Sequence, residues 1–242
     1  MTGRLAVQPR ASTRVLVTGA TDMGKTRWEF AYARPVRRVL AYDTQHEWQW
    51  LGLAGDAAPW SRAWMYVDEL EQLAGEAGFR SGVLRLAVRP RPGEKERGPE
   101  NAHERFCRAA RRIGNCLTVH AEISAYAGAS PGETYPEFTE LIVRGRHYGV
   151  SIVADGQRLY QFPTALRENL SRAIIYRLPN RRAARALDEL LDDPAAAQQA
   201  LRLPDYHFLD WTPRGGVRVC APVALSERAA LDPSHLERSS SP

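Results

Sequence analysis

Residues 17–26 read VTGATDMGKT, a glycine followed by four residues and then Gly-Lys-Thr. The apolar run RVLV at 14–17 leads into this stretch, and the helix-compatible residues 28–33, WEFAYA, follow it. The pattern G-x-x-x-x-G-K-[ST] between a strand and a helix is typical of a phosphate-binding loop. The sequence therefore predicts a nucleoside triphosphate site here. The alternative is a glycine turn between strand and helix that binds nothing.

The residue types in this loop match the chemistry of a triphosphate. Glycines let the backbone curl so that amide N–H groups point at phosphate oxygens, and the helix N-terminus adds partial positive charge. Lys25 is expected to reach the β and γ phosphates, and the Thr26 hydroxyl is expected to bind Mg²⁺, which prefers oxygen ligands. The predicted nucleotide-binding residues are Gly19, Ala20, Thr21, Asp22, Met23, Gly24, Lys25 and Thr26.

The positive charge of the chain is carried almost entirely by arginine. Of the 33 basic residues only Lys25 and Lys95 are lysines, so one of the two stands inside the glycine motif. A phosphate-binding loop uses a compact ammonium there, and a forked guanidinium does not replace it. The formal net charge of +5 is compatible with a polyanionic partner.

Length and composition predict one globular domain. The chain has 242 residues, 44% of them hydrophobic. It contains no apolar run approaching eighteen residues and no apolar segment at its start, so we expect a soluble, intracellular protein without a membrane span. Cys107, Cys116 and Cys220 have no metal-ligand spacing, so we expect free thiols in a reducing compartment and no structural zinc.

Strand-like runs alternate with helical segments along the chain. This alternation predicts a mainly parallel sheet with helices on both faces, followed by a surface helix at 181–200 and a small C-terminal hairpin. Further strands are expected at 36–43, 83–88, 116–123, 150–154 and 173–178, a helix at 135–148, and the hairpin strands at 206–209 and 216–219. We expect an N-terminal arm at 1–13, one domain at 14–225 and a disordered tail at 226–242.

The segment LTVHAEI at 117–123 resembles the second acidic strand end of a P-loop enzyme, with one departure. Glu122 occupies the place of a catalytic glutamate, but Ala121 occupies the place of the aspartate that holds Mg²⁺. Either hydrolysis is slow, or Asp43 or Asp155 substitutes from another strand end. Glu122 could alternatively cap a turn, and His120 is expected to be a strand histidine facing its neighbours.

Two further residues are candidates for contacts with the γ-phosphate. Gln157 follows a predicted central strand, where a glutamine can bond both the attacking water and the phosphate. Arg146 lies near a helix end just before that strand, where it could be offered to the nucleotide of a neighbouring subunit. A surface arginine is, however, usually only solvated.

Taken together, these residues resemble the FtsK/HerA superfamily of ring-forming ATPases that pump DNA. The resemblance covers about residues 14–178 and is carried by the order and spacing of several motifs. These are GATDMGKT, AYDTQHEW, LTVHAEIS, RGRHYGVSIVADGQR and the downstream LREN followed by AIIYRL. A motor domain of this size without further domains looks most like the genome-packaging ATPases of membrane-containing icosahedral viruses.

The resemblance implies a RecA-like core that binds ATP and Mg²⁺ and forms a hexamer around double-stranded DNA. It also implies that Glu122 is the general base, Gln157 the γ-phosphate sensor and Arg146 an arginine finger acting in trans. The implied partner is a capsid-vertex or membrane protein of a virion, and the implied location is the host cytoplasm or the virion itself. The loop at 89–105, with Arg91, Lys95 and Arg97, is a candidate DNA contact.

We therefore expect ATP-driven translocation of double-stranded DNA, most specifically packaging of a viral genome into a preformed capsid. Two alternatives stay open: a small-molecule P-loop kinase, and a nucleotide-binding assembly protein in which Ala121 has weakened hydrolysis. A GTPase is disfavoured because the sequence has no Asn-Lys-x-Asp motif.

Overall fold

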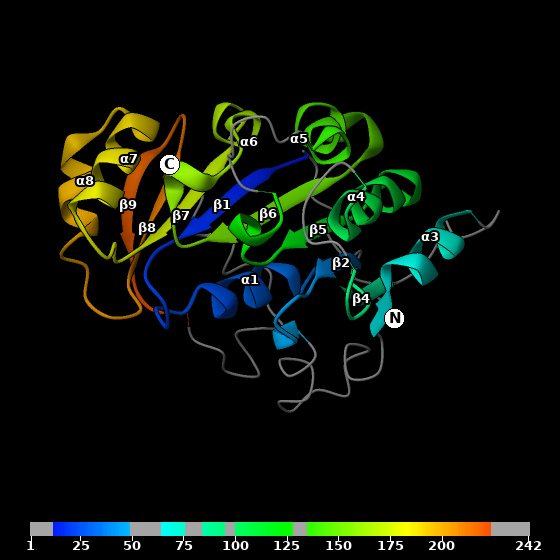
Figure 1. The fold of residues 1–242 in the computed structure, drawn as a ribbon. Helices are drawn as coiled ribbons and strands as arrows, with labels where there is room; N and C mark the ends of the chain where they lie inside the picture. Colours follow the sequence, from blue (N-terminus) through cyan, green and yellow to red (C-terminus); the bar gives the residue numbers. More distant parts are fainter. Residues whose placement is uncertain (1–11, 49–63, 76–83, 95–99, 128–134, 224–242) are drawn as a thin grey trace, which may run out of the picture.

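The structure is a computed structural model that describes residues 12–48, 64–75, 84–94, 100–127 and 135–223 (Figure 1). The predicted tail at 226–242 and all but two residues of the predicted arm lie outside these ranges. The strands are β1 (Arg14–Thr18), β2 (Arg38–Tyr42), β3 (Trp64–Tyr66), β4 (Leu84–Arg89), β5 (Leu117–His120), β6 (Ser151–Gly156), β7 (Arg172–Tyr176), β8 (Phe208–Thr212) and β9 (Gly216–Cys220).

The described strands form one sheet in the order β3-β4-β2-β5-β6-β1-β7-β8-β9. The seven strands from β3 to β7 in this order are parallel, whereas β8 pairs antiparallel with both β7 and β9. The strand that leads into the glycine loop, β1, is therefore central, between β6 and β7. This confirms the predicted parallel sheet and the C-terminal hairpin.

Side chains alternate between the two faces of the sheet, as a strand requires. Val15 and Val17 pack with Trp28 and Phe30 of α1, whereas Leu16 packs in the larger cluster beneath the remaining helices. Figure 1 shows α1 on one side of the sheet and α4, α5 and α6 on the other. The helices are α1 (Lys25–Ala33), α3 (Val67–Gly75), α4 (Ala102–Ile113), α5 (Pro136–Tyr148), α6 (Thr164–Glu168), α7 (Arg181–Leu191) and α8 (Pro194–Ala200), with short 3₁₀ turns η2 (Ile123–Ala125) and η3 (Leu159–Gln161).

One sequence expectation about the elements was wrong, and one element was missed. The single helix expected at 181–200 is two helices, because Asp192 adopts a left-handed conformation with φ 52° and Asp193 caps a new helix that begins at Pro194. The short edge strand β3 was not predicted at all. Among the described helices, none combines the length and the hydropathy of a membrane span.

Candidate nucleotide-binding site

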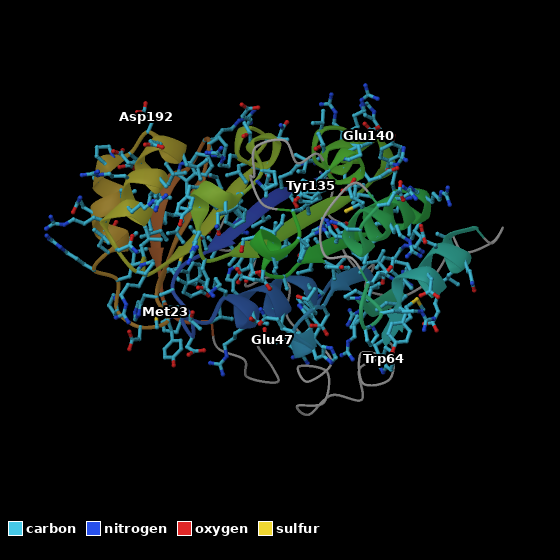
Figure 2. The ribbon with its side chains drawn as sticks, in the orientation of Figure 1. Met23, Glu47, Trp64, Tyr135, Glu140 and Asp192 are labelled. Atoms are coloured by element: carbon cyan, nitrogen blue, oxygen red, sulfur yellow. The ribbon has the colours of Figure 1, made fainter. Side chains whose placement is uncertain are left out.

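A cavity of about 540 Å³ opens at the carboxyl ends of the central strands. Residues that follow β1, β2, β5 and β6 meet there, at the edge where open parallel sheets place their ligands. Figure 2 shows the labelled Met23 and Glu47 on the side of the sheet that carries α1. The cavity is lined by Thr21, Asp22, Gly24, Lys25, Thr26, Arg27, Gln45, Glu47, Ala121, Glu122, Asp155, Gln157 and Tyr206.

The glycine loop curls through three residues with positive φ: Gly19 at 141°, Asp22 at 60° and Gly24 at 97°. A Cβ on Gly19 would lie 2.5 Å from the Cβ of Tyr176 on β7, so only glycine fits there. The Ala20 amide donates to the carbonyl of Arg177 at 2.9 Å. The start of the loop is thus anchored to the chain after β7, and Gly19, Ala20 and Met23 do not line the cavity.

Lys25 is the first residue of α1 and is buried. Its Nζ donates to the carbonyls of Gly19 and Ala20, at 3.3 and 3.2 Å, so the ammonium lies within the curve of the loop. Loop amides, a helix N-terminus and one buried ammonium form a donor set that fits a triphosphate. The predicted residues Thr21, Asp22, Gly24, Lys25 and Thr26 all line this cavity.

The hydroxyl of Thr26 donates to Glu47 Oε2 at 2.8 Å, which brings a carboxylate to the expected Mg²⁺ ligand. The Glu47 amide in turn donates to Asp43 Oδ1 at 2.9 Å. Asp43 also forms an ion pair with Arg89 at 3.4 Å, is fully buried and does not line the cavity. Asp43 therefore positions Glu47 and does not itself face the cavity.

Asp155, at the end of β6, lies beside Ala121. Because β5 and β6 pair His120 with Ala154, the next positions on the two strands are neighbours. Asp155 lines the cavity, and its Oδ1 accepts a hydrogen bond from the Glu122 amide. Burial raises the pKa of Asp155 to about 7, although the Glu122 amide and the charge of Lys25 oppose the shift. The strand next to β5 thus places a carboxyl group beside Ala121 in the cavity wall.

A second carboxyl group, Glu29, lies one helical turn after Lys25 on α1 and is fully buried. Neither of its oxygens has a hydrogen-bond partner within the described ranges. Burial raises the pKa of Glu29 well above its usual range, and the charge of Asp155 adds to the shift. Sequence reasoning missed Glu29, although the Lys-x-x-x-Glu spacing places both side chains on one helix face.

The structure places the remaining predicted residues in two different parts of the molecule. Glu122 has a left-handed backbone, with φ 50° and ψ 55°, and its Oε1 accepts from Ser124 Oγ at 2.7 Å. Glu122 and the exposed Gln157 both line the cavity. Arg146 is exposed in the last turn of α5, which leads into the start of β6. It therefore lies toward the amino ends of the strands, whereas the cavity of its own chain lies at their carboxyl ends.

Tyr206 is a cavity residue that sequence reasoning did not assign to the site. It follows α8, half of its surface is exposed, and its backbone φ is 64°, which is rare for a bulky residue. A Cβ on Gly24 would lie 3.5 Å from the Tyr206 ring, so the ring lies against the glycine loop. No sequence motif marked this tyrosine, because it is brought to the loop only by the packing of the C-terminal segment.

Comparison with solved structures identifies the same architecture. The genome-packaging NTPase B204 from Sulfolobus turreted icosahedral virus 2, in complex with sulfate, superposes with a TM-score of 0.67 at 16% sequence identity, covering 89% of this chain and 98% of that one. The two chains share one fold. B204 from Sulfolobus turreted icosahedral virus, a DNA-packaging ATPase, gives a TM-score of 0.66 at 15% identity over 90% and 100% of the two chains.

A more distant neighbour has the same fold. VirB4 of Thermoanaerobacter pseudethanolicus gives a TM-score of 0.55 at 9% identity and covers 93% of both chains. No protein-family model matches the sequence, and no curated protein does. The resemblance to FtsK/HerA-type ATPases drawn from the motifs is thus confirmed at the level of fold, by structure and not by sequence similarity.

Proposed function

We propose that this chain is an ATPase that translocates double-stranded DNA, and that it packages a viral genome into a preformed capsid. The observation that carries the proposal is the convergence of Lys25, Thr26, Glu122 and Asp155 on one cavity. The fold around this cavity matches B204 in complex with ATP-γS, with a TM-score of 0.67 over 90% of this chain. Fold alone does not determine function, so the argument rests on the chemistry of the cavity.

Each end of an ATP molecule has matching groups in the cavity. The amides of Thr21 to Gly24 and the Lys25 ammonium provide donors for phosphate oxygens. The ring of Tyr206 offers an aromatic surface at the mouth of the same cavity, which suits a stacked base. Thr26 and Glu47 provide the oxygen atoms that would hold Mg²⁺. Bound there, Mg²⁺ would neutralise charge on the β and γ phosphates.

The groups around Ala121 divide the work of hydrolysis. Glu122 is the proposed general base, and its carboxylate is oriented by the hydroxyl of Ser124. Asp155 fixes the backbone of Glu122 and places a carboxylate where it can accept from Mg²⁺-bound water. Gln157 is proposed to bond the attacking water and the γ-phosphate. On this proposal, Ala121 does not abolish turnover, because Asp155 restores the missing charge.

The assembly is proposed to be a homo-hexamer in which Arg146 reaches a neighbour's cavity. Arg146 is exposed near the amino ends of the strands, away from the cavity of its own chain, which is compatible with a trans role. Contacts with duplex DNA would be made to phosphates, independently of sequence. Arg91, one of the candidate DNA contacts, forms a bidentate pair with Asp68 at 3.0 and 2.7 Å in this chain, while Lys95 and Arg97 lie outside the described residues.

Packaging requires contacts beyond DNA. We propose that the partner is a capsid-vertex or membrane protein of a virion. The site of action would then be the host cytoplasm or the virion. Both parts of this proposal rest on the likeness to B204.

The test is ATP turnover by the purified full-length chain with Mg²⁺, measured with and without linear duplex DNA. We expect DNA to raise the rate several-fold, and the stimulation to fall steeply as salt rises. Lys25→Ala should lower the rate at least about 100-fold, because it removes the ammonium that would stabilise negative charge on the γ-phosphate during transfer. Arg185→Ala, at an exposed position of α7, is the matched loss of one positive charge away from the cavity and should leave the rate within about twofold.

Two results would overturn the motor. Turnover that is indifferent to DNA but rises with a small phosphate acceptor would favour a kinase. Tight nucleotide binding without turnover, in the presence and absence of DNA, would favour an assembly protein. Both assays use the same preparation of protein. Its circular dichroism spectrum and melting temperature show whether that preparation is folded.

A further inference from the structure

Three metal-ligating side chains converge in the core on the α4 side of the sheet. His103 Nε2 and His120 Nδ1 lie 2.8 Å apart, and Cys107 Sγ lies 3.7 Å from His103 Nε2. All three ligand atoms lie within 4.8 Å of one another, and all three residues have no exposed surface. His120 points to the α4 side of β5, where it meets His103, whereas Lys25 belongs to α1 on the other side of the sheet.

The fold positions these groups through two elements. His103 and Cys107 are four positions apart on α4, so they share one helix face. His120 is the last residue of β5 and points to the same side of that strand as Thr118. The sequence expectation considered cysteine spacing alone. It therefore missed a His-x-x-x-Cys pair that only the sheet brings to a second histidine.

Hydrogen bonds determine the tautomer of His120, and so which of its nitrogens offers a lone pair to the cluster. The Thr118 hydroxyl donates to the Ser151 carbonyl at 3.2 Å, so Thr118 Oγ1 accepts from His120 Nε2–H at 2.9 Å. His120 Nδ1 is then unprotonated and points at His103. This second contact on the far nitrogen is the usual way in which proteins orient a metal-binding histidine.

The other histidine has a buried nitrogen that the core leaves unsatisfied. Within the described ranges, His103 Nδ1 has no hydrogen-bond partner. If Nε2–H donates to His120, then Nδ1 is a buried acceptor with no donor. If the proton moves to Nδ1, two lone pairs face each other across 2.8 Å. A cation held by His103 Nε2, His120 Nδ1 and the Cys107 sulfur would remove that repulsion, and His103 Nδ1 would then carry the proton.

One of the three spacings matches that around a tetrahedral ion, one is too short, and the third, from Cys107 to His120, is at most 4.8 Å. Zn–N bonds near 2.0 Å and Zn–S bonds near 2.3 Å place two nitrogen ligands roughly 3.3 Å apart and a nitrogen and a sulfur roughly 3.6 Å apart. The Cys107 to His103 distance of 3.7 Å meets this requirement. The two imidazoles would need to separate by about 0.5 Å, a small rotation of either ring.

The protonation of the cluster also suits a metal. Burial lowers the pKa of His120 to about 3 and lowers the pKa of His103 well below its usual range, so both imidazoles are neutral donors at physiological pH. Burial raises the pKa of the Cys107 thiol. An ion that binds must therefore displace the thiol proton, and one proton is released to solvent for each ion bound.

We propose that His103, Cys107 and His120 bind one thiolate-preferring transition-metal ion, Zn²⁺ or Cu⁺, as a structural site. Neutral imidazole and thiolate are the ligands that both ions accept. The ion would tie α4 to the end of β5, directly before Ala121 and Glu122. The metal site does not depend on nucleotide binding, so this proposal can be tested independently of the proposed ATPase function.

The test uses the full-length protein treated with a chelator and then titrated with Co²⁺, Zn²⁺ or, under reducing conditions, Cu⁺. We expect one ion per chain, a rise in melting temperature, and a thiolate-to-cobalt charge-transfer band in the near ultraviolet. Zn²⁺ and Cu⁺ are distinguished by which one displaces cobalt at lower concentration. Proton release can be measured in the same titration with a weakly buffered indicator.

Cys107→Ser is the decisive variant, and Cys116→Ser is its control, because Cys116 is also buried but lies outside the cluster. Cys107→Ser should remove the charge-transfer band and weaken binding about 100-fold, while Cys116→Ser should keep both. The proposal is overturned if the wild-type protein gives no such band. It is also overturned if binding survives Cys107→Ser, since the ion would then lie on surface histidines. Should Cys107→Ser fail to fold, the wild-type cobalt spectrum alone decides.

Discussion

Asp155 Oδ1 accepts a hydrogen bond from the backbone amide of Glu122, which joins the end of β6 to the residue that follows the end of β5. The two strands are adjacent and parallel, so this bond places a carboxylate beside Ala121. On the proposed mechanism, this carboxyl group takes the place of the aspartate that Ala121 replaces. A side chain on a neighbouring parallel strand can supply such a carboxylate, because the carboxyl ends of parallel strands lie together at one end of the sheet.

The first prediction concerns this exchange. Asp155→Asn keeps an oxygen that can accept from Glu122 but removes the charge, so it should lower Mg²⁺-dependent ATP turnover about 100-fold. Adding Ala121→Asp to Asp155→Asn should recover at least about tenfold of that loss, because the charge returns one strand away. Steady-state turnover across a Mg²⁺ titration measures both effects.

Glu189→Gln, on an exposed position of α7, removes one negative charge far from the cavity and serves as the control. If Asp155→Asn turns over ATP at the wild-type rate, the compensating carboxylate lies elsewhere. If Ala121→Asp gives no recovery in the double variant, adjacency to Ala121 is not what makes Asp155 matter.

The second prediction is a pH dependence of stability in the absence of nucleotide and Mg²⁺. The pKa of Asp155 is raised from 3.8 to about 7 in the folded chain, so folding favours the protonated form. This contribution is fully present below about pH 4 and is lost as pH rises through 7. Between pH 5 and pH 8 the free energy of unfolding should fall more steeply in the wild type than in Asp155→Asn.

The difference between the two curves should be on the order of 2 kcal/mol. Chemical denaturation at several pH values measures it. The two proteins are compared in a Glu29→Gln background, because the charge of Asp155 itself raises the pKa of Glu29. Parallel curves for the two proteins would contradict the raised pKa of Asp155.

Much of the fold followed from local patterns in the sequence. Buried parallel strands read as continuous apolar runs, and the runs around Leu16, Leu40 and Ile152 were predicted as strands for that reason. Strand β3 escaped prediction because three residues are too short to show a period. The break between α7 and α8 escaped it because Asp192 and Asp193 read as ordinary polar positions of one long helix.

The site was predictable only where a residue belongs to a contiguous motif. Lys25 and Glu122 were found because each lies in a recognisable run of neighbours. Tyr206 reaches the cavity only through the packing of a distant segment. Glu47 lies in the AYDTQHEW run but was given no role of its own, and Asp43 was a candidate until its contact with Arg89 placed it behind Glu47. Glu29 had a visible signal, its spacing from Lys25, but a charged residue on a helix is usually taken to be solvated.

The third prediction tests the anchoring of the glycine loop. In Gly19→Ala the new Cβ would meet the Tyr176 Cβ at 2.5 Å, at a backbone φ of 141° that alanine disfavours. The loop must shift, so ATP affinity should fall at least about tenfold and the free energy of unfolding by about 1–3 kcal/mol. Binding of a fluorescent ATP analogue and chemical denaturation measure the two effects.

Gly75→Ala is the matched control, because a Cβ on Gly75 meets no atom within 4 Å and its φ is unexceptional. It should bind nucleotide normally. Equal losses in both variants would mean that the effect reflects glycine replacement in general and not the contact with Tyr176.

The fourth prediction concerns the tyrosine at the mouth of the cavity. If Tyr206 stacks on the base, Tyr206→Ala should weaken ATP binding about tenfold, and Tyr206→Phe should leave it within about twofold, because the ring carries the interaction. Binding of inorganic triphosphate, which has no base, should be unaffected by either variant. A loss of triphosphate affinity in Tyr206→Ala would instead indicate that the ring only supports the glycine loop.

The last prediction separates a trans arginine from a solvated one. Lys25→Ala removes the nucleotide site but keeps Arg146, whereas Arg146→Ala keeps the site but removes the arginine. Each variant alone should be nearly inactive. When the two are mixed in equal amounts, about a quarter of the interfaces in a random ring pair an intact cavity with an intact neighbouring arginine, so up to about a quarter of wild-type turnover should return.

Arg144→Ala is the control for this mixing experiment, since Arg144 is also exposed on α5 and pairs with Glu140 at 3.5 Å. It should retain activity alone and in mixtures. An arginine that acted within its own chain would give no recovery on mixing, and a merely solvated one would leave Arg146→Ala active. Recovery therefore requires both that subunits assemble and that the Arg146 guanidinium of one subunit reaches the cavity of the next. The mixing experiment thus distinguishes an arginine that acts in trans from one that acts in its own chain and from one that is only solvated.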